Sequence, residues 1–574
     1  MSQYTLYVAI KYPRSEDTSG TREGLPVTRT RIEKIFPKLT QAQMDRIALY
    51  GHTRSVKPGD ILIEQGDTPM PFFVVMTGEV EIVSPFGTHE TLITVHGNGQ
   101  FTGDVNMISG RRSIVRARAT VPSEVIELQN KDLLRLVQND AELSEILMRA
   151  FILRRVELIA AGVGDLILIG SAHSAGTLRI KDFLLRNGHP YSYVDLEQDS
   201  DVQNLLDGFQ TSASDIPVLI CRGQVVLRNP NNQEIADCLG FNESIDQTQA
   251  RDLVIVGAGP SGLAAAVYGA SEGLDVVVLE TSSPGGQAGS SSKIENYLGF
   301  PTGISGQDLA GRAYMQAQKF GAKMLISRAT RILCDHRPYI VETESGARIP
   351  ARTVLIATGA QYRRLPLEHL SQFEGAGVYY GATFVERQLC GGDEVIVVGG
   401  GNSAGQAAVY LSETAKQVYV LVRSASLATS MSRYLISRIE EAPNIVVKSN
   451  TEIITLEGNH QLDSVHWRNN QTGETEKRNI KHIFIMTGAD PNTSWLNDCL
   501  MLDAKGFINT GPDLSPEKLR AVGWSLKREP YLLETSLPGI FAAGDVRGGS
   551  IKRVAAAVGE GSTVISFVHK IIQE

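Results

Sequence analysis

Two glycine-rich turns decide the fold of this chain: VIVGAGPSGLAAA (residues 254–266) and VIVVGGGNSAGQAA (residues 395–408). Each turn follows an apolar run that predicts a buried strand, and each opens a run of small residues that predicts a helix. A single turn of this kind is a weak signal. Two of them, 142 residues apart, predict tandem α/β folds that hold two dinucleotides face to face, as hydride transfer between a nicotinamide and a flavin requires.

The first turn has the pattern Gly257-x-Gly259-x-x-Gly262. Gly257 permits the tight turn, Gly259 lets the backbone approach a pyrophosphate, and Gly262 lets helix and strand pack closely. The helix N-terminus offers free N–H groups to the phosphates. The next predicted strand, DVVVLE, ends in Glu280, 23 residues beyond Gly257, where an acid can accept the hydroxyls of an adenosine ribose.

The second turn has the pattern Gly399-x-Gly401-x-x-Ala404. Its matching strand, QVYVLVR, ends in Arg423 rather than in an acid. An acid repels a 2′-phosphate and an arginine accepts it, so the sequence favours NADP over NAD. The alternative is that Arg423 is only a solvated residue at a strand end.

A third segment, GIFAAGDVRGG, places Gly544 and Asp545 after an apolar strand near the C-terminus. We expect the first dinucleotide fold to be interrupted by the second and to resume here, which gives an FAD domain at 250–377 and 489–574 around an NAD(P) domain at 378–488. Asp545 would then reach the ribityl hydroxyls of a flavin; otherwise the pair forms an ordinary Gly-Asp turn.

Composition limits the class of protein. The 574 residues are 42% hydrophobic and 21% charged, with a net charge of -8, which is typical of a multidomain globular protein and gives no support for nucleic-acid binding. No apolar run is long enough for a membrane span. No two of the five cysteines have CxxC spacing, so we expect a reduced cytoplasmic protein with mostly structural thiols. They are Cys221, Cys238, Cys334, Cys390 and Cys499.

Three further regions precede the glycine turns. Residues 1–29 are polar and predict a loose leader. Residues 30–162 contain short apolar runs between glycine turns, typical of a small β-barrel or sandwich, followed by one or two amphipathic helices in 130–162. Residues 163–245 have the order β-α-β-α-β-β, which predicts a small α/β domain.

Residues 251–574 resemble thioredoxin reductase of the low-molecular-weight bacterial type. Besides the glycine turns, the resemblance rests on PGGQ (284–287), IENYLGFPTGISGQDL (294–309), IATGA (356–360) and FAAGDVR (541–547). It implies FAD and NADPH as cofactors and, by analogy, a homodimer. The residues implied for FAD are Gly257, Gly259, Pro260, Ser261, Gly262, Glu280, Gln287, Asn296, Gly544 and Asp545; those implied for NADPH are Gly399, Gly401, Asn402, Ser403, Ala404 and Arg423.

The chain departs from that family at its redox centre. The family's CxxC segment corresponds to residues 380–384, where Gly381 and Phe384 replace the two cysteines, so this segment cannot form a disulfide. Lys552 and Arg553 replace an Arg-Gln pair near the flavin; they either stabilise reduced flavin or are surface charges at a helix start. Cys390 is either a relocated thiol or, as we favour, a small apolar filler.

The two upstream regions carry resemblances of their own. Residues 164–245 resemble a glutaredoxin/thioredoxin fold, with the segment 216–218 at its cis-proline turn and SAHSAG (171–176) in place of its CxxC. This implies a docking or structural module.

Residues 30–160 resemble a cyclic-nucleotide-binding domain. The resemblance implies that Gly103, Asp104, Arg112 and Ser113 hold a cyclic nucleotide or another anion. The alternative is that the arginine only decorates an exposed turn. No helix-turn-helix follows, which excludes a transcription factor of this type.

Three functions remain open. The first is an FAD-dependent NADPH oxidoreductase without an internal disulfide relay, gated by a ligand at the N-terminal domain, with a protein redox partner or a small molecule as acceptor. The second is a non-catalytic sensor that binds FAD and NADP. The third is conventional thioredoxin reduction through an external thiol.

Overall fold

The computed structural model describes residues 29–86, 89–161, 164–171, 174–196, 215–222, 225–242, 245–459, 461–496 and 499–574. The chain divides into two compact units: Met1–Ser171, Asn187–Asn242 and Gln318–Phe320 form unit 1, and Ala172–Arg186, Glu243–Ala317 and Gly321–Glu574 form unit 2. Three predicted features lie outside the described residues: the leader except for Arg29, the second helix predicted within 163–245, and residues 172–173 of SAHSAG.

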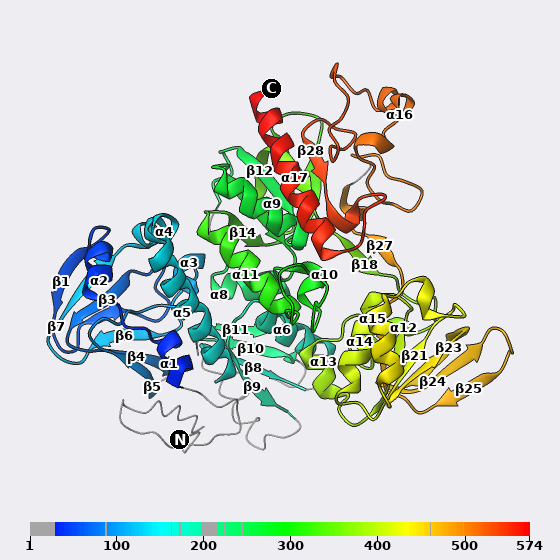
Figure 1. Ribbon diagram of the computed structural model, residues 1–574, viewed down its shortest axis with the longest axis horizontal. Coiled ribbons are helices and arrows are strands. Elements are labelled where there is room, and N and C mark those ends of the chain that lie inside the picture. The colour runs from blue at the N-terminus through cyan, green and yellow to red at the C-terminus, as the bar shows by residue number, and fades with distance from the viewer. Residues whose placement is uncertain are drawn as a thin grey trace. The chain divides into compact units, whose positions relative to one another are not determined.

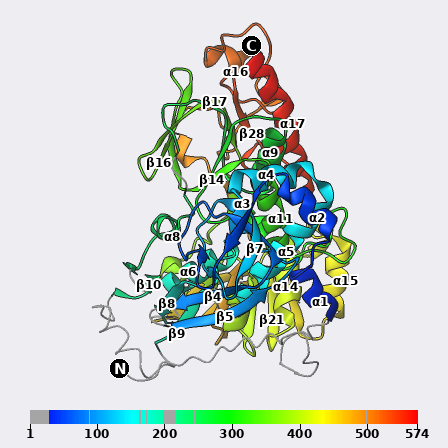
Figure 2. The same cartoon turned by 90° about the vertical axis from the view of Figure 1, so that its left-hand side faces the viewer.

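Unit 1 begins with a β-rich domain of two antiparallel sheets, ordered β1-β7-β3 and β2-β6-β4-β5 (Figures 1 and 2). Buried side chains follow one another along β3, and the rings of Phe72, Phe101 and Phe151 lie 5.8–6.2 Å apart in the core. The predicted small barrel or sandwich is thus confirmed. The strands are β1 (His52–Val56), β2 (Ile61–Ile63), β3 (Phe72–Thr77), β4 (Val80–Phe86), β5 (His89–His96), β6 (Arg116–Ala119) and β7 (Ser123–Leu128).

Five helices accompany these strands. The predicted helical stretch after the sheets forms two helices, because Asp140 ends α4 with extended backbone and its side chain then caps α5 by accepting a hydrogen bond from the Leu143 N–H at 3.0 Å. The helices are α1 (Arg29–Ile35), α2 (Gln41–Ala48), α3 (Asn106–Ser109), α4 (Asn130–Asn139) and α5 (Ala141–Ala160).

The second part of unit 1 is a four-stranded sheet in the order β11-β10-β8-β9. β8 is parallel to β9 and antiparallel to β10, and β10 is antiparallel to β11. The Ile216–Pro217 peptide is cis. This matches the predicted order of strands, while the assignment to a glutaredoxin/thioredoxin fold stays a prediction. The elements are β8 (Leu166–Gly170), β9 (Ser192–Asp195), β10 (Val218–Cys221), β11 (Val225–Arg228) and helix α8 (Asn232–Leu239).

Unit 2 contains helix α6 (Ala175–Arg186) and a first sheet in the order β14-β13-β12-β17-β16-β15. β12, β13, β14 and part of β17 are parallel, with hydrophobic runs that are buried on both faces. The C-terminal β28 pairs with β17, and helix α17 lies beside α9 (Figure 1). The last segment of the chain therefore completes the sheet that carries the first glycine turn. The strands are β12 (Arg251–Val256), β13 (Val276–Glu280), β14 (Lys323–Ile326), β15 (Ala329–Leu333), β16 (Tyr339–Thr343), β17 (Arg348–Ile356) and β28 (Ile540–Ala542); the helices are α9 (Pro260–Ser271), α10 (Gly286–Gly289), α11 (Gly306–Lys319), α16 (Pro516–Ala521) and α17 (Val554–Gln573).

A second parallel sheet, ordered β19-β26-β20-β21-β22, carries the second glycine turn, and an antiparallel β23-β24-β25 sheet follows it. Two short antiparallel strands, β18 and β27, lie where the chain passes between the two dinucleotide folds. The tandem α/β architecture is confirmed. The strands are β18 (Ala360–Tyr362), β19 (Val378–Tyr379), β20 (Glu394–Val398), β21 (Gln417–Leu421), β22 (Ile445–Lys448), β23 (Thr451–Gly458), β24 (Leu462–Asn469), β25 (Thr475–Arg478), β26 (His482–Ile485) and β27 (Ala489–Pro491). The helices are α12 (Leu370–Phe373), α13 (Phe384–Leu389), α14 (Asn402–Ser412) and α15 (Arg433–Glu441), with 3-10 turns η2 (Leu427–Thr429), η3 (Ser494–Leu496), η4 (Gly511–Asp513) and η5 (Gly544–Val546).

The cysteines depart from the prediction of mostly reduced thiols. Cys221 is joined to Cys238, with their Cα atoms 6.8 Å apart, and Cys334 to Cys499, with Cα atoms 6.4 Å apart. The prediction was wrong for these four residues because the fold closes sequence separations of 17 and 165 residues. Sequence spacing does not show such pairings.

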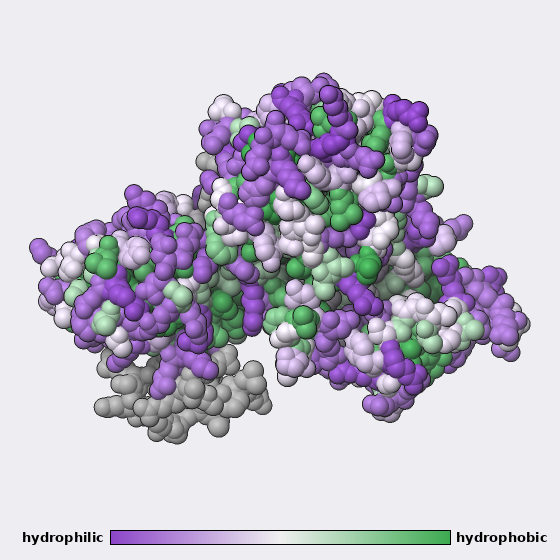
Figure 3. Space-filling view, turned by 45° about the horizontal axis from the view of Figure 1, so that its top comes forward, coloured by the Kyte–Doolittle hydropathy of each residue, from purple (hydrophilic) through white to green (hydrophobic). Residues whose placement is uncertain are grey.

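Among the helices of the described ranges, none is long and apolar enough to cross a membrane. On the face seen in Figure 3, hydrophilic residues are spread widely and hydrophobic ones occur in small groups.

Candidate functional site

The first glycine turn lies between β12 and the N-terminus of α9. Gly257 has φ +106°, and a Cβ on it would collide with the Ala357 carbonyl. A Cβ on Gly262 would collide with the Gly257 carbonyl, whereas one on Gly259 would meet no atom within 4 Å. The turn thus needs two glycines for its own packing and leaves open space at the third. Such space in front of a helix N-terminus fits a pyrophosphate.

Glu280 ends β13 beside this turn and is 9% exposed. Its Oε2 accepts a hydrogen bond from the Ala258 N–H at 2.8 Å, and its Oε1 accepts from the Thr281 and Ser282 N–H groups at 2.9 and 3.0 Å. An ionised carboxylate has about four lone-pair sites. The backbone therefore fixes the carboxylate and leaves Oε2 with capacity for a ribose hydroxyl.

The C-terminal Gly-Asp segment meets the same turn. A Cβ on Gly544 would lie 2.7 Å from the Ser261 Oγ, and that hydroxyl donates to the Ala543 carbonyl at 3.4 Å. Asp545 is half-buried, and burial raises its pKa while the nearby Lys552 lowers it. The fold thus brings Gly544 to the turn that contains Gly259 and Ser261. Gly259 and Gly544 are 285 residues apart in the sequence.

Four other residues that were predicted to lie near FAD are Gln287, Asn296, Lys552 and Arg553. The Gln287 amide donates to the Ala360 carbonyl at 2.5 Å, and Asn296 is exposed. Lys552 is exposed, with its ammonium 3.4 Å from the Asp545 carbonyl oxygen and over the Phe507 ring at 4.8 Å, and Arg553 is exposed at the N-cap of α17. Their roles toward a flavin stay predictions.

Glu560 on α17 holds the Gly-Asp segment and was not found from the sequence. Its Oε2 accepts from the Gly544 N–H at 2.7 Å, and its Oε1 pairs with the Arg547 guanidinium at 2.5 Å. A lone glutamate inside a helix gives no signal in the sequence.

Replacing Glu560 with glutamine should weaken FAD binding about tenfold, or ~1.4 kcal/mol. The glutamine amide cannot hold both the Gly544 N–H and the Arg547 charge, so the Gly-Asp segment loosens. Flavin dissociation followed by fluorescence measures the effect. The exposed Glu517→Gln on α16 is the control, and an equal loss in that variant would contradict the role given to Glu560.

The second glycine turn repeats the geometry of the first. Gly399 has φ +142° and a Cβ on it would meet the Met486 carbonyl at 2.5 Å, while a Cβ on Gly401 would meet nothing within 4 Å. Asn402 accepts from the Ser432 N–H at 2.7 Å, and the Ser403 hydroxyl bonds Tyr362 of β18. Ala404 is buried behind the turn.

Arg423 lies two residues beyond the end of β21 and is exposed. Within the described ranges it makes no ion pair or side-chain hydrogen bond. A guanidinium in this position is available to a 2′-phosphate, so its placement is compatible with the predicted role.

The segment that replaces the family's CxxC forms the N-terminal cap of helix α13. Thr383 caps α13 together with Glu386, which is a reciprocal capping box. Cys390, at the other end of α13, is fully buried, and its burial raises the pKa of the thiol to about 11. A neutral buried thiol is a poor nucleophile, which is what a packing role predicts.

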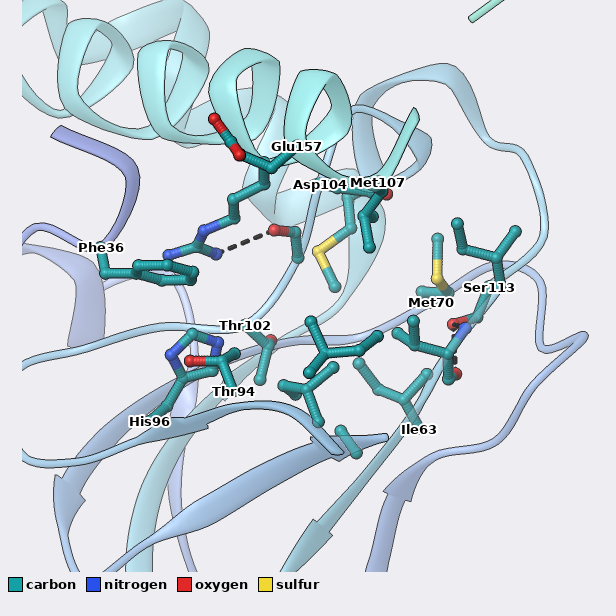
Figure 4. Close-up of a pocket in the computed structure, with 18 of the residues that line it drawn as sticks. Phe36, Ile63, Met70, Thr94, His96, Thr102, Asp104, Met107, Ser113 and Glu157 are labelled. Carbon is teal, nitrogen blue, oxygen red and sulfur yellow. Dashed lines mark hydrogen bonds between the residues drawn. The ribbon is translucent and has the colours of Figure 1, made fainter. Parts of the chain in front are cut away.

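The N-terminal β domain contains a cavity of about 70 Å³ lined by Gly103, Asp104 and Ser113 (Figure 4). Arg112 is not in its lining. It lies against the C-cap of α8, where a Cβ on Gly240 would be 2.7 Å from its Nε. The fold therefore separates Arg112 from the three residues with which it was grouped. Asp104 pairs with Arg155 of α5 at 2.7 Å.

Two buried polar residues of this cavity, His96 and Arg154, were not found from the sequence. The signal for Arg154 was present: Arg154 and Arg155 adjoin in FILRRVEL, an otherwise apolar helix face. Ala150, Phe151 and Leu158, three or four residues from Arg154, are buried, so Arg154 lies on the inner side of the helix.

Comparisons with known proteins agree with this geometry. Residues 251–561 match the pyridine nucleotide-disulphide oxidoreductase family, and residues 53–140 match the cyclic nucleotide-binding domain. The thioredoxin reductase of Ureaplasma parvum is 32% identical over 322 residues, covering 56% of this chain and 96% of that protein. The NADPH-dependent thioredoxin reductase 3 of Arabidopsis thaliana is 31% identical over 59% of this chain and 63% of its own length.

A solved structure gives the same result. The thioredoxin reductase of Lactococcus lactis aligns with a TM-score of 0.50 and 28% identity, over 56% of this chain and 99% of that one. The predicted resemblances to thioredoxin reductase and to a cyclic-nucleotide-binding domain are confirmed, and so are the two predicted cofactors, since thioredoxin reductases use FAD and NADPH. With two glycine turns built for dinucleotides and a match over more than half its length, the chain belongs to the pyridine nucleotide-disulphide oxidoreductase family and is thioredoxin-reductase-like.

Proposed function

We propose that the chain is an FAD-dependent NADPH oxidoreductase that passes electrons to an acceptor outside its own sequence, without a CxxC relay. FAD and NADPH, when bound, supply the hydride transfer. The observation that carries the proposal is the pair of glycine turns, each with open space before a helix N-terminus at Gly259 and Gly401, in a chain whose CxxC segment holds Gly381 and Phe384.

The chain's residues would bind and orient the two cofactors. Gly259 and the N-terminus of α9 would receive the pyrophosphate of FAD, with Glu280 at its ribose and Asp545 at its ribityl chain. Gly401, Asn402 and the N-terminus of α14 would receive NADPH, with Arg423 at the 2′-phosphate. The strands β18 and β27 offer a two-stranded connection about which one dinucleotide fold can turn against the other, a motion that brings nicotinamide to flavin.

The acceptor would be a partner's disulfide, a quinone, another small electrophile or an iron–sulfur protein. None of these requires a thiol of the chain itself. We further propose that a ligand at the N-terminal β domain gates the turning of the dinucleotide folds, with a cyclic nucleotide or another anion as the ligand. A homodimer and a cytoplasmic location complete the proposal by analogy.

Anaerobic titration with NADPH tests the proposal directly. We expect stoichiometric loss of the absorbance band of oxidised flavin, at a rate faster with NADPH than with NADH, and turnover on addition of a quinone or a disulfide. A flavin that stays oxidised while NADP binds tightly would favour the alternative of a non-catalytic sensor.

The same assay separates this proposal from thiol-dependent chemistry. The variant Cys390→Ala should keep wild-type flavin reduction and acceptor turnover within about twofold, because its thiol is buried and neutral. The double variant Cys334→Ser/Cys499→Ser should do the same. Loss of acceptor turnover with intact flavin reduction in either variant would show that an internal thiol carries the electrons.

A further inference from the structure

The cavity of the N-terminal β domain is small and mostly apolar (Figure 4). Its wall includes Ile63, Met70, Ile82, Ile93, Ile114 and Leu158. The cavity volume is about 70 Å³, and one water molecule needs roughly 10–15 Å³. The space therefore suits a ligand of about five to seven non-hydrogen atoms.

Within the residues that the structure describes, two side chains in the lining present buried polar atoms without a hydrogen-bond partner. Arg154 is 7% exposed, and its Nε and Nη1 donate to the carbonyls of Ile35, Phe101 and Gly103 at 2.8–3.0 Å. Its Nη2 is buried and, within the described part of the chain, has no hydrogen-bond acceptor. His96 is 2% exposed, and its Nδ1 is likewise buried and without a hydrogen-bond partner among the described residues. Buried polar groups are nearly always hydrogen-bonded, so two unpartnered polar atoms in one cavity are unusual.

Among the described residues, the guanidinium of Arg154 forms no ion pair within 4.0 Å. The nearby carboxylate of Asp104 is paired with Arg155 at 2.7 Å. Burial lowers the pKa of Arg154 to about 9, and Asp104 raises it only in part. Burial and the charge of Arg154 together lower the pKa of His96, which keeps that imidazole neutral. Glu157 lines the cavity as a half-buried side chain.

The position of these groups gives the cavity a polar end and an apolar end. In Figure 4, His96 and Thr94 lie together near Phe36, and Ile63, Met70 and Ser113 lie at the opposite end. Arg112, the residue expected to clamp a cyclic phosphate, lies outside the lining. The arrangement offers the Arg154 guanidinium and, in the tautomer protonated at Nδ1, the His96 imidazole to a single anionic head, with mostly apolar side chains beyond them.

We propose that this cavity binds a small aliphatic carboxylate, with its head group on the Arg154 Nη2 and the His96 Nδ1 and its chain among the isoleucines. The carboxylate would accept a hydrogen bond from each of these two nitrogen atoms. Its negative charge would balance that of the buried guanidinium. The chain removes apolar surface from water at about 25 cal/mol per Å². This binding site stands independently of the flavin chemistry proposed above.

Isothermal titration of the full-length protein with pentanoate and 3-methylbutanoate tests the proposal. We expect saturable binding of at least one acid, with pentan-1-ol, which has no charge, binding at least tenfold more weakly. Cyclic AMP should show no saturable binding over the same concentration range. Tight binding of cyclic AMP with none of either acid would overturn the proposal, and since no turnover is measured, an inactive flavin centre cannot produce that result.

Variants locate the binding. Arg154→Met should weaken carboxylate binding at least tenfold, while the matched control Arg149→Met, an exposed arginine on the same helix, should not change it. Because Arg154 also holds three carbonyls, its variant can lose stability. Ala117→Leu, at a fully buried wall position, fills the cavity without touching the arginine and should abolish binding in a protein whose thermal unfolding stays cooperative. Unchanged carboxylate binding in Ala117→Leu would place the ligand elsewhere and refute the proposal.

Discussion

Replacing Gly259 with valine should give a folded, colourless protein. A Cβ at this position meets no atom within 4 Å, and its φ of -69° suits any residue. The apo fold therefore tolerates the side chain. The open space is where the pyrophosphate must approach the backbone, so we expect FAD affinity to fall at least ~100-fold, or about 2.7 kcal/mol. Flavin content after purification, together with thermal unfolding of the apoprotein, measures both effects.

Gly311→Val is the matched control for this experiment. Gly311 lies inside α11 and a Cβ on it also meets no atom within 4 Å, so the variant carries the same substitution in open space away from the turn. It should remain yellow. A Gly259→Val protein with the flavin content of the wild type would show that the pyrophosphate does not lie at this turn.

Replacing Arg423 with leucine should raise the KM for NADPH about 10- to 100-fold and leave the KM for NADH unchanged. A hydrogen bond to a charged group contributes about 1.5–3 kcal/mol, and tenfold in affinity corresponds to ~1.4 kcal/mol. The change should lie in KM rather than in kcat, because the 2′-phosphate is remote from the transferred hydride. Initial rates of flavin reduction with each coenzyme give the two KM values.

Arg433→Leu serves as the control for this pair of measurements. Arg433 is an exposed arginine at the start of α15 whose contact with Glu440 is a loose 3.7 Å. Its loss should affect neither coenzyme. If Arg423→Leu changes the KM for NADPH and NADH equally, the arginine acts on something shared by both coenzymes and the preference for NADPH has another source.

The two dinucleotide folds were predictable because their signals are local. Gly262 is required by its contact with the Gly257 carbonyl in the same turn, and Gly257 by its own φ of +106°, and such requirements leave a fixed spacing in the sequence. The break at Asp140, where α4 ends and the same side chain caps α5, is also local, although the sequence pattern left open whether this stretch forms one helix or two. Short-range packing and capping need only a few neighbouring residues, so a single sequence displays them.

In the N-terminal β domain, the position of the Arg112 side chain could not be predicted from local sequence patterns. The order of its strands followed from apolar runs and glycine turns, but the sequence did not show that the Arg112 side chain lies against Gly240, outside the cavity lined by Gly103 and Asp104. Arg112 packs against Gly240, from a segment more than a hundred residues away. The direction of a side chain in a turn depends on what the rest of the chain places beside it.

The sequence by itself determined that the chain carries tandem dinucleotide folds and that no CxxC spacing occurs. Each of these depends on residue identity at short, fixed intervals. Only the tertiary structure decided that Cys221 joins Cys238 and Cys334 joins Cys499, that Glu560 holds the Gly-Asp segment, and that His96 and Arg154 share a buried cavity. These pairings arise from the closure of long loops, and no local pattern in the sequence records which distant residues meet when such loops close.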